Sequence, residues 1–473
     1  MDTKVVSSLR EAIALTGLQS GMTVSFHHHL RGGDFVLNLV LRELADMGLR
    51  DLTVNASSLF DVHAPLLGHI NNHVVTKIQT DYMAAGLGRA VSAGVLETPV
   101  EFRTHGGRPC DIARGVTPID VAFLAAPTAD PMGNCSGKTG QSACGSLGYA
   151  VADARYARRV VVITDHLVPY PLQDWSIPET DVDYVVAVDA IGDPRGIVSG
   201  TTKLTRDPVG LVMADYAAQV IRHSGLLRDG FSFQTGAGGA SLAAAQFLKE
   251  IMVRENIHGS FGLGGITGSL VEMLRAGCFQ TLLDVQCFDL QAVESLRQDP
   301  RHREISAAHY AGPTVKSAVV DSLDVVILGA TEVDTDFNVN VHTDSGGSIM
   351  GGSGGHSDAA AGAKLTVILA PLFRARLPIV TDRVACVSTP GRDVDVLVTQ
   401  GGIAVNPKNP DLRRRLLDAG LPVLDIGELK ERAERLTGVP RPVPRGERAV
   451  AKVIGRDGTL LSTIFNVPTR ERT

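Results

Sequence analysis

The string in this sequence with the clearest chemical potential is a run of histidines after a short apolar stretch. His27, His28 and His29 directly follow residues 22–26, which alternate as a β-strand does, and Arg31 comes next. In an extended chain His27 and His29 share one face and His28 takes the other. Imidazole and guanidinium groups at one strand end suit a polycarboxylate, because guanidinium binds carboxylate through paired hydrogen bonds. We therefore expect substrate-binding roles for these four residues.

The histidine run also allows two alternative interpretations. Imidazole binds zinc well, but the sequence lacks a third ligand at a standard spacing, so we expect no metal here. The other alternative is a cluster of solvated or internally bonded histidines, which we rank below anion binding. If an anion binds, side chains on loops of the same half could extend its site. These loop residues are His63, Arg103, His105 and Arg108.

Two glycine turns could supply backbone donors to a reacting group. Residues 231–235 alternate as a strand, 236–239 are glycine-rich, and 240–250 favour a helix. Such a turn directs N–H groups and the positive end of a helix to one place, which suits a phosphate or an oxyanion. Residues 261–268 repeat the pattern. The glycines that we expect to act in catalysis are Gly236, Gly238, Gly239, Gly264 and Gly265.

The first glycine turn also allows two less specific interpretations. It nearly matches the dinucleotide-binding fingerprint, with Ser241 where glycine or alanine is usual. Glu255, at the distance expected of the ribose-binding carboxylate, falls after the helix instead of ending a second strand. The glycines could also serve only close packing of a helix against a strand.

Polar residues of the second half are further candidates for substrate binding. Asn338 and Asn340 follow a predicted strand, where they could orient a ligand. His356 and Asp358 lie near Ser353, which raises the possibility of a serine-hydrolase triad. Residues adjacent in sequence rarely form one, because triad members converge from separate elements.

The elements that must position these residues repeat along the chain. Three collinear pairs of β-rich segments recur at a nearly constant spacing of about 205 residues, which predicts an internal duplication. Each half then forms an open, mostly parallel α/β sheet, whose ligands lie beyond the carboxyl ends of the strands. The paired segments are 21–26 with 230–235, 120–126 with 324–330, and 159–163 with 364–368.

We expect two domains, 1–222 and 223–473, with a cleft between them. Apolar runs flank Asp457-Gly458, which predicts a C-terminal β-hairpin, and we place it in the second domain. Within the first domain, Asp34 is the predicted N-cap of a helix over 35–47.

Composition excludes several classes of protein. The 473 residues carry a net charge of −6 without a basic block, so nucleic acid is not an expected partner. No apolar run approaches the roughly 18 residues of a membrane span, and the start lacks an apolar signal core. The six cysteines are scattered without a Cys-x-x-Cys motif, which is typical of reduced thiols in the cytoplasm.

Several long strings, in order along the chain, resemble the citrate lyase α chain. One of them is Phe-Ser-Phe-Gln-Thr-Gly-Ala-Gly-Gly-Ala-Ser-Leu at 231–242. The likeness extends from about Ser8 to the predicted hairpin. The other strings are 21–31, 57–66, 145–150, 168–171, 288–290, 336–341, 354–358 and 402–407.

The resemblance implies a duplicated fold of the CoA-transferase type and a citrate:acyl-carrier-protein transferase. Such an enzyme moves a thioester from acetate to citrate, and CoA thioesters are expected to serve as well. The family also implies a complex with a lyase β chain and an acyl-carrier γ chain. The carrier holds a phosphoribosyl-dephospho-CoA arm, and this subunit needs no metal. We expect a cytoplasmic homo-oligomer.

The resemblance also bears on the mechanism. In related CoA-transferases a glutamate attacks the thioester, whereas the comparable segment here, 261–265, has no carboxylate. We therefore expect direct attack by a citrate carboxylate through a mixed anhydride, aided by positioning and oxyanion donors. An acyl-CoA hydrolase, a citramalate-type CoA-transferase and a non-catalytic ligand-sensing protein remain alternatives.

Overall fold

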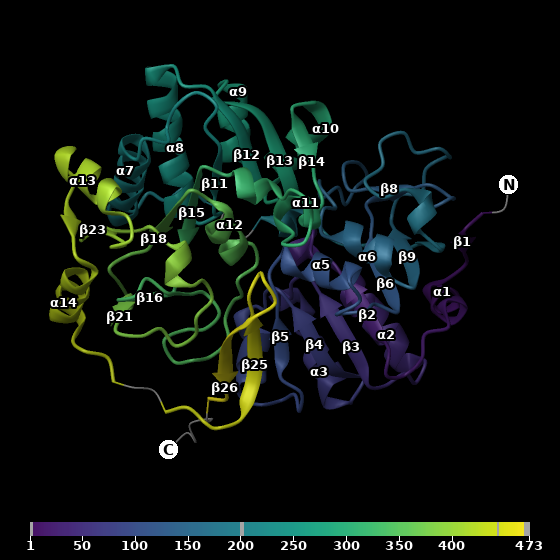
Figure 1. The fold of residues 1–473 in the computed structure, drawn as a ribbon. Coiled ribbons are helices and arrows are strands. Elements are labelled where there is room, and N and C mark those ends of the chain that lie inside the picture. Colours follow the sequence, from purple (N-terminus) through teal and green to yellow (C-terminus); the bar gives the residue numbers. More distant parts are fainter. Residues whose placement is uncertain (1–2, 199–202, 442–443, 468–473) are drawn as a thin grey trace.

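A computed structural model describes residues 3–198, 203–441 and 444–467 (Figure 1). Two large sheets dominate it, and neighbouring strands are parallel except for the pairs β25–β26 and β22–β23. The first sheet has the order β1 (Val5–Val6), β10 (Tyr184–Ala187), β9 (Arg159–Thr164), β6 (Val121–Ala125), β2 (Thr23–Phe26), β3 (Leu52–Ala56), β4 (Val75–Thr80), β5 (Val100–Phe102), β25 (Ala449–Ile454) and β26 (Leu460–Phe465).

The second sheet has nine strands, and short two- and three-stranded sheets flank both large ones. The order of the second sheet is β14 (His302–Glu304), β13 (Phe279–Cys287), β12 (Gly259–Ile266), β11 (Phe233–Thr235), β15 (Val325–Gly329), β18 (Leu365–Leu369), β22 (Val396–Thr399), β23 (Gly402–Val405) and β24 (Val423–Leu424). The short sheets consist of β7 (Thr128–Ala129), β8 (Cys135–Ser136), β16 (Glu332–Asp334), β17 (Val339–Asn340), β19 (Phe373–Arg374), β20 (Leu377–Pro378) and β21 (Val380–Thr381).

Helices connect the strands and pack against the sheets (Figure 1). Those of the first half are α1 (Leu9–Thr16), α2 (Val36–Asp46), α3 (Leu66–Asn71), α4 (Ala85–Ser92), α5 (Gly107–Ala113), α6 (Ala150–Tyr156) and α7 (Pro208–His223). Those of the second half are α8 (Gly239–Glu255), α9 (Gly268–Arg275), α10 (Leu290–Gln298), α11 (Ala307–Ala311), α12 (His356–Gly362), α13 (Pro410–Asp418) and α14 (Ile426–Thr437).

The expected duplication is visible in the order of the strands. The series β9-β6-β2-β3-β4 in the first sheet matches β18-β15-β11-β12-β13 in the second. The three segment pairs found in the sequence coincide with β2 and β11, β6 and β15, and β9 and β18. Strands such as β6 are buried along their whole length, as continuous apolar runs predict for a parallel sheet covered on both faces.

The C-terminal hairpin is present, but it extends the first sheet. β25 pairs in parallel with β5, matching Ala451 with Val100, and Figure 1 shows the hairpin (yellow) beside that strand. Our assignment of the hairpin to the second domain is therefore wrong, while the boundary at residue 222 stays a prediction. The physical reason is that β5 would otherwise be an edge strand with unpaired backbone groups, which the returning chain covers.

The helix predicted over 35–47 is present as α2, but its N-cap position is Phe35, one residue later than predicted. The carboxylate of Asp34, just before it, accepts hydrogen bonds from the N–H groups of Val36 and Leu37, as a capping side chain does. All six cysteines are buried and unpaired.

In the ranges described here, no helix is long and apolar enough to cross a membrane, and no group of three or more His, Cys, Asp or Glu side chains is placed to hold a metal.

Candidate functional site

The carboxyl ends of β2 and β13 bring the two halves into contact. His28 follows β2, and its Nε2 lies 3.0 Å from Oε1 of Gln286 on β13. The amide Nε2 of Gln286 donates to the carbonyl of His28 at 3.0 Å, which orients the amide. Nearby, the Ser146 hydroxyl donates to the carbonyl of Asp284 at 3.0 Å. The expected junction of the two halves therefore lies where ligands of such sheets bind.

The three histidines lie together at this junction and are bonded to the protein itself. His27 and His29 contact each other through Nδ1, and their Nε2 atoms accept from the N–H groups of Ala125 and Tyr149. Burial lowers the pKa of His27 to about 4 and the pKa of His28 and His29 well below the usual value. At neutral pH the run is uncharged, so its role in binding an anion stays a prediction.

Arg31 is a cation of this region with no anionic partner among the described residues. Its guanidinium carbon lies 4.6 Å from the ring centre of Phe288 and 5.5 Å from that of Phe60. One nitrogen donates to the carbonyl of Ile197 at 3.2 Å, and no described carboxylate oxygen lies within 4.0 Å. Arg31 also has a φ of 49°, a strained value for a residue with a side chain, and such strain gathers at functional sites. These features suit an anion from outside the protein.

One ring nitrogen of His105 is held by a carboxylate, and the other has no hydrogen-bond partner in the part of the chain that the structure describes. Its ring Nδ1 lies 2.9 Å from Oδ2 of the buried Asp81, and its backbone N–H donates to the carbonyl of Gly354 at 2.9 Å. Burial raises the pKa of Asp81. A side chain at position 354 would place Cβ 3.1 Å from Nε2 of His105, so glycine leaves that nitrogen uncovered. A histidine oriented by a carboxylate is a common arrangement for proton transfer or polar recognition.

The two glycine segments lie on neighbouring parallel strands, but only the first is a turn. Gly264 and Gly265 lie within β12, at a shift in its register with β13, and not in the turn that the sequence predicts. Gly264 has a φ of 102°, and an added Cβ would lie 2.9 Å from the side-chain amide of Gln234. At Gly265 an added Cβ would lie 2.3 Å from the ring of Phe288. Positions 264 and 265 therefore need glycine, whereas an added Cβ at Gly236 or Gly238 would meet no atom closer than 3.7 Å. The role of these glycines as oxyanion donors stays a prediction.

The first turn is less open to a ligand at its start than we expect from the sequence. The N–H of Gly236 donates to the carbonyl of Ile327 at 3.0 Å, which occupies one predicted donor. Gly238 is the N-cap of α8 and Gly239 its first residue. The helix end thus directs N–H groups past the carboxyl end of β11.

Two predicted ligands of the first half have partners within the fold. His63 lies 2.9 Å from the Asp34 carboxylate, and both are buried. Arg108 forms a two-pronged pair with Asp153, at 2.9 and 2.6 Å, and donates from Nε to Asn55 Oδ1 at 2.7 Å. Buried charges are usually paired in this way, so the geometry favours structural roles for both residues.

The two predicted asparagine ligands support loops of the second half. Asn338 donates to Asp334 at 3.1 Å and accepts from the N–H of Gly391 at 2.9 Å. Asn340 donates to Glu332 at 3.1 Å, across the pair of short strands β16 and β17. These contacts give each amide a structural partner.

His356 and Asp358 also have internal partners. His356 contacts the Thr389 hydroxyl and the Gly329 carbonyl, each at 2.8 Å, and burial lowers its pKa to about 4. Asp358 accepts from Thr104 Oγ1 and the N–H of Gly106, each at 2.8 Å, which joins α12 to the first half. A serine triad, which the adjacency of these residues made improbable, does not form around His356, because its nitrogens face other groups.

Asp358 should make stability depend on pH. Burial raises its pKa to about 6, against about 3.9 for an unfolded chain. Between these values the folded state binds a proton that the unfolded state lacks, so this group favours folding more as pH falls from about 6 to 4. Relative to Asp358→Asn, the wild-type unfolding free energy should rise by about 2 kcal/mol between pH 7 and 4.5. Urea unfolding of both proteins at the two pH values measures it, and a constant difference would contradict it.

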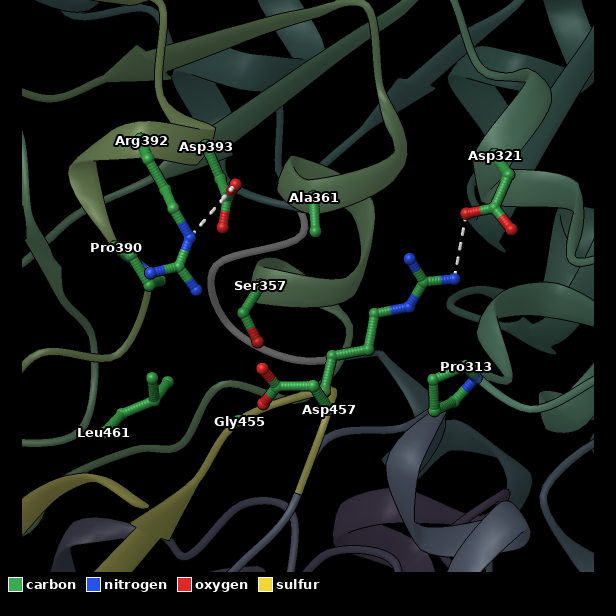
Figure 2. A pocket seen from close by; sticks show the side chains of 11 residues that line it. Pro313, Asp321, Ser357, Ala361, Pro390, Arg392, Asp393, Gly455, Asp457 and Leu461 are labelled. Atoms are coloured by element: carbon green, nitrogen blue, oxygen red, sulfur yellow. Dashed lines mark hydrogen bonds and ion pairs between the residues drawn. The ribbon is translucent and has the colours of Figure 1, made fainter. Parts of the chain in front are cut away.

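A separate hollow of about 340 Å³ lies between the hairpin turn and the second half. Figure 2 shows Arg392 facing Asp393. Asp321 forms an ion pair with Arg456 at 2.9 Å. Cations and carboxylates alternate around it, and no predicted site residue lines it. Its lining residues are Pro313, Asp321, Ser357, Ala361, Pro390, Arg392, Asp393, Gly455, Arg456, Asp457 and Leu461.

We define the junction site as Arg31, Asp81, His105, Tyr149 and Gly264. The sequence pointed to three of these residues and missed Asp81 and Tyr149. The ring of Tyr149 lies 4.4 Å from that of His105, between centres. Asp81 directly follows β4, and a polar residue at the carboxyl end of a predicted strand is the signal that could have found it.

The sequence of this chain is similar to a known protein family over nearly its whole length. Residues 2–467 match the protein family described as "Citrate lyase, alpha subunit (CitF)". The citrate lyase alpha chain of Klebsiella pneumoniae is 51% identical over 464 residues, which cover 98% of this chain and 91% of the relative. The chain belongs to the citrate lyase alpha-subunit family. That membership carries a transferase role in citrate lyase.

Solved structures agree with the family. The alpha subunit of citrate lyase from Streptococcus mutans, solved in complex with citrate, has a TM-score of 0.96 and 50% identity, covering 98% of this chain and 92% of its own. A Pseudomonas malonate decarboxylase hetero-tetramer chain has a TM-score of 0.67 at 18% identity, covering 93% and 92%, which shows the fold alone. The expected CoA-transferase type of fold is confirmed.

Proposed function

We propose that this alpha subunit transfers an acyl-carrier thioester from acetate to citrate. The observation that carries the proposal is Arg31, a half-buried cation without a described carboxylate partner, at the junction that also holds His105. A guanidinium binds a carboxylate through paired hydrogen bonds, and citrate offers three carboxylates. The Streptococcus mutans relative, solved in complex with citrate, supports citrate as the ligand.

In this proposal a carboxylate oxygen of citrate attacks the carbonyl carbon of the acetyl thioester. The C–S bond breaks, the thiolate leaves, and a mixed anhydride of acetate and citrate remains. The thiolate then attacks the citryl carbonyl of the anhydride, and acetate leaves. No proton is consumed and no bond to the enzyme forms, so the protein supplies binding, positioning and stabilisation of negative charge.

Asp284, an acid on the strand beside β12, supports direct attack by citrate, because its carboxylate already has protein partners. Asp284, on the neighbouring strand β13, accepts from the N–H of Gln286 at 2.7 Å and from the Cys287 thiol at 2.9 Å. It also lies 3.2 Å from Nε2 of His302, and it is fully buried. β12 itself has no carboxylate between Gly259 and Ile266. Asp284 is therefore not free to attack the thioester, which supports attack by citrate itself.

The proposal includes the partners of the alpha subunit. The acyl group arrives on a carrier chain through its phosphoribosyl-dephospho-CoA arm, and the citryl thioester passes to a lyase chain. CoA thioesters substitute for the carrier. We place the protein in the cytoplasm as a homo-oligomer that assembles with these chains.

A thioester-exchange assay tests the function. Incubation with acetyl-CoA or the acetylated carrier and labelled citrate should yield citryl thioester and free acetate, with citrate preferred over citramalate. Release of acetate without citryl thioester would favour the hydrolase, and citrate binding without exchange would favour a ligand-sensing protein. Hydroxylamine or borohydride, added with the acetyl thioester, should leave the enzyme active. Inactivation mapped to a glutamate such as Glu332 would overturn direct attack.

A further inference from the structure

Tyr149 presents a hydroxyl with no hydrogen-bond partner among the described residues. Its side chain is 4% exposed, and its ring centre lies 4.6 Å from that of His28 and 4.4 Å from that of His105. Tyr310, by contrast, is a buried tyrosine whose hydroxyl has a partner: it accepts a hydrogen bond from Gln234 Nε2 at 2.8 Å. A hydroxyl at the junction that bonds no described residue is available to a ligand.

Close packing of the neighbouring backbone places Tyr149 between the two halves. An added Cβ at Gly148 would lie 2.3 Å from the carbonyl oxygen of Ile305 and 2.7 Å from that of Val285. Glycine thus lets the first half press directly on the second, and the N–H of Ala307 donates to the Gly148 carbonyl at 2.9 Å. Tyr149 follows at the start of α6, where its own N–H donates to His29. Backbone contacts at Gly148 and at Tyr149 itself therefore fix the position from which the Tyr149 side chain extends.

We propose that the Tyr149 hydroxyl donates a hydrogen bond to the thioester carbonyl oxygen as negative charge develops on it. The inference rests on the proposed acyl transfer. When the citrate oxygen bonds to the carbonyl carbon, the electron pair of C=O moves to oxygen. It returns as the C–S bond breaks, and the phenolic proton stays on Tyr149 throughout. Tyr149 is then a catalytic residue, because its hydroxyl supplies a hydrogen bond to the oxyanion in addition to any from the backbone of the glycine segments.

The surroundings of Tyr149 suit a neutral donor. Burial, with Tyr310 and Asp81 nearby, keeps the pKa of Tyr149 well above its usual value, so the phenol retains its proton at pH 7. Its stacked neighbours His28 and His29 are uncharged at that pH, since burial lowers their pKa. A donor held by packed rings needs no reorganisation when charge develops, and low polarity strengthens its hydrogen bond.

Tyr149→Phe tests the inference, because it removes the hydroxyl and keeps the ring. The kcat of thioester exchange should fall about 10²–10³-fold, the usual loss for one oxyanion donor. Citrate affinity, measured by calorimetry, should change less than about threefold, which also shows that the variant is folded. Tyr184→Phe is the matched control, since that hydroxyl donates to the Leu15 carbonyl at 3.3 Å far from the junction.

The outcomes separate the inference from the function on which it rests. A wild-type protein that exchanges no thioester would refute the proposed function and the role of Tyr149 with it. Exchange by the wild type with an equally active Tyr149→Phe variant would refute the role of Tyr149 alone. The same holds if the variant loses only citrate affinity, because the hydroxyl would then bind the ground state.

Discussion

Arg31→Gln should lower kcat/KM for citrate by roughly 10²–10³-fold while the melting temperature changes little. Removing one partner of a desolvated charge pair costs about 2–5 kcal/mol, and each 1.4 kcal/mol is about a factor of ten. The free protein loses no ion pair, since no described carboxylate lies within 4.0 Å of Arg31. The stacking on Phe288 and Phe60 contributes less, at about 0.5–2 kcal/mol. Steady-state exchange with citrate as the varied substrate measures the effect.

Two further variants decide whether charge or geometry matters at Arg31. Arg31→Lys keeps the charge but loses the paired donors, so it should recover only part of the rate. Arg195→Gln is the matched control, because its side chain is 84% exposed and bonded to Asp193 on the surface. An Arg31→Gln variant with unchanged kcat/KM for citrate would remove this residue from the site.

The fold was largely predictable because hydrophobic pattern and repetition carry it. Apolar runs such as 121–125 and 325–328 are strands at equivalent places in the two sheets. The partner of the hairpin was not predictable. β25 pairs with β5 across roughly 350 residues of sequence, and neither segment carries a local signal for the other. Pairing at an edge depends on which strand the rest of the fold leaves uncovered.

The candidate site was predictable only in part, since a polar residue type does not reveal its partners. Arg31 and Arg108 are both arginines near predicted loops, yet only Arg108 has a buried carboxylate against it. Buried polar groups need partners, so a structural residue and a ligand-binding one can look alike in sequence. Tyr149 shows the converse, because only its surroundings reveal that its hydroxyl is unpaired. A single sequence therefore indicates the region of the site, but it does not show which side chains are left without partners to bind a ligand.

Asp153→Ala should lower the unfolding free energy by about 3–5 kcal/mol, the usual cost of leaving a buried charge unpaired. Arg108 is 2% exposed and Asp153 is fully buried, and two guanidinium nitrogens of Arg108 donate to the carboxylate oxygens of Asp153 at 2.6 and 2.9 Å. Asn55 Oδ1, at 2.7 Å from Arg108 Nε, is neutral and cannot balance the charge. Urea unfolding of wild type and variant measures the difference.

Controls for Asp153→Ala also decide what Arg108 does. Asp183→Ala breaks the more exposed pair with Arg159 and should cost less than about 1 kcal/mol. Replacing both buried partners, as Arg108→Met with Asp153→Leu, should restore much of the lost stability, because no charge is then left uncompensated. If Arg108 instead binds citrate, Asp153→Ala would leave stability near wild type and raise KM for citrate. Loss of stability in the single variant, with recovery of both stability and exchange in the double one, would assign Arg108 to the fold.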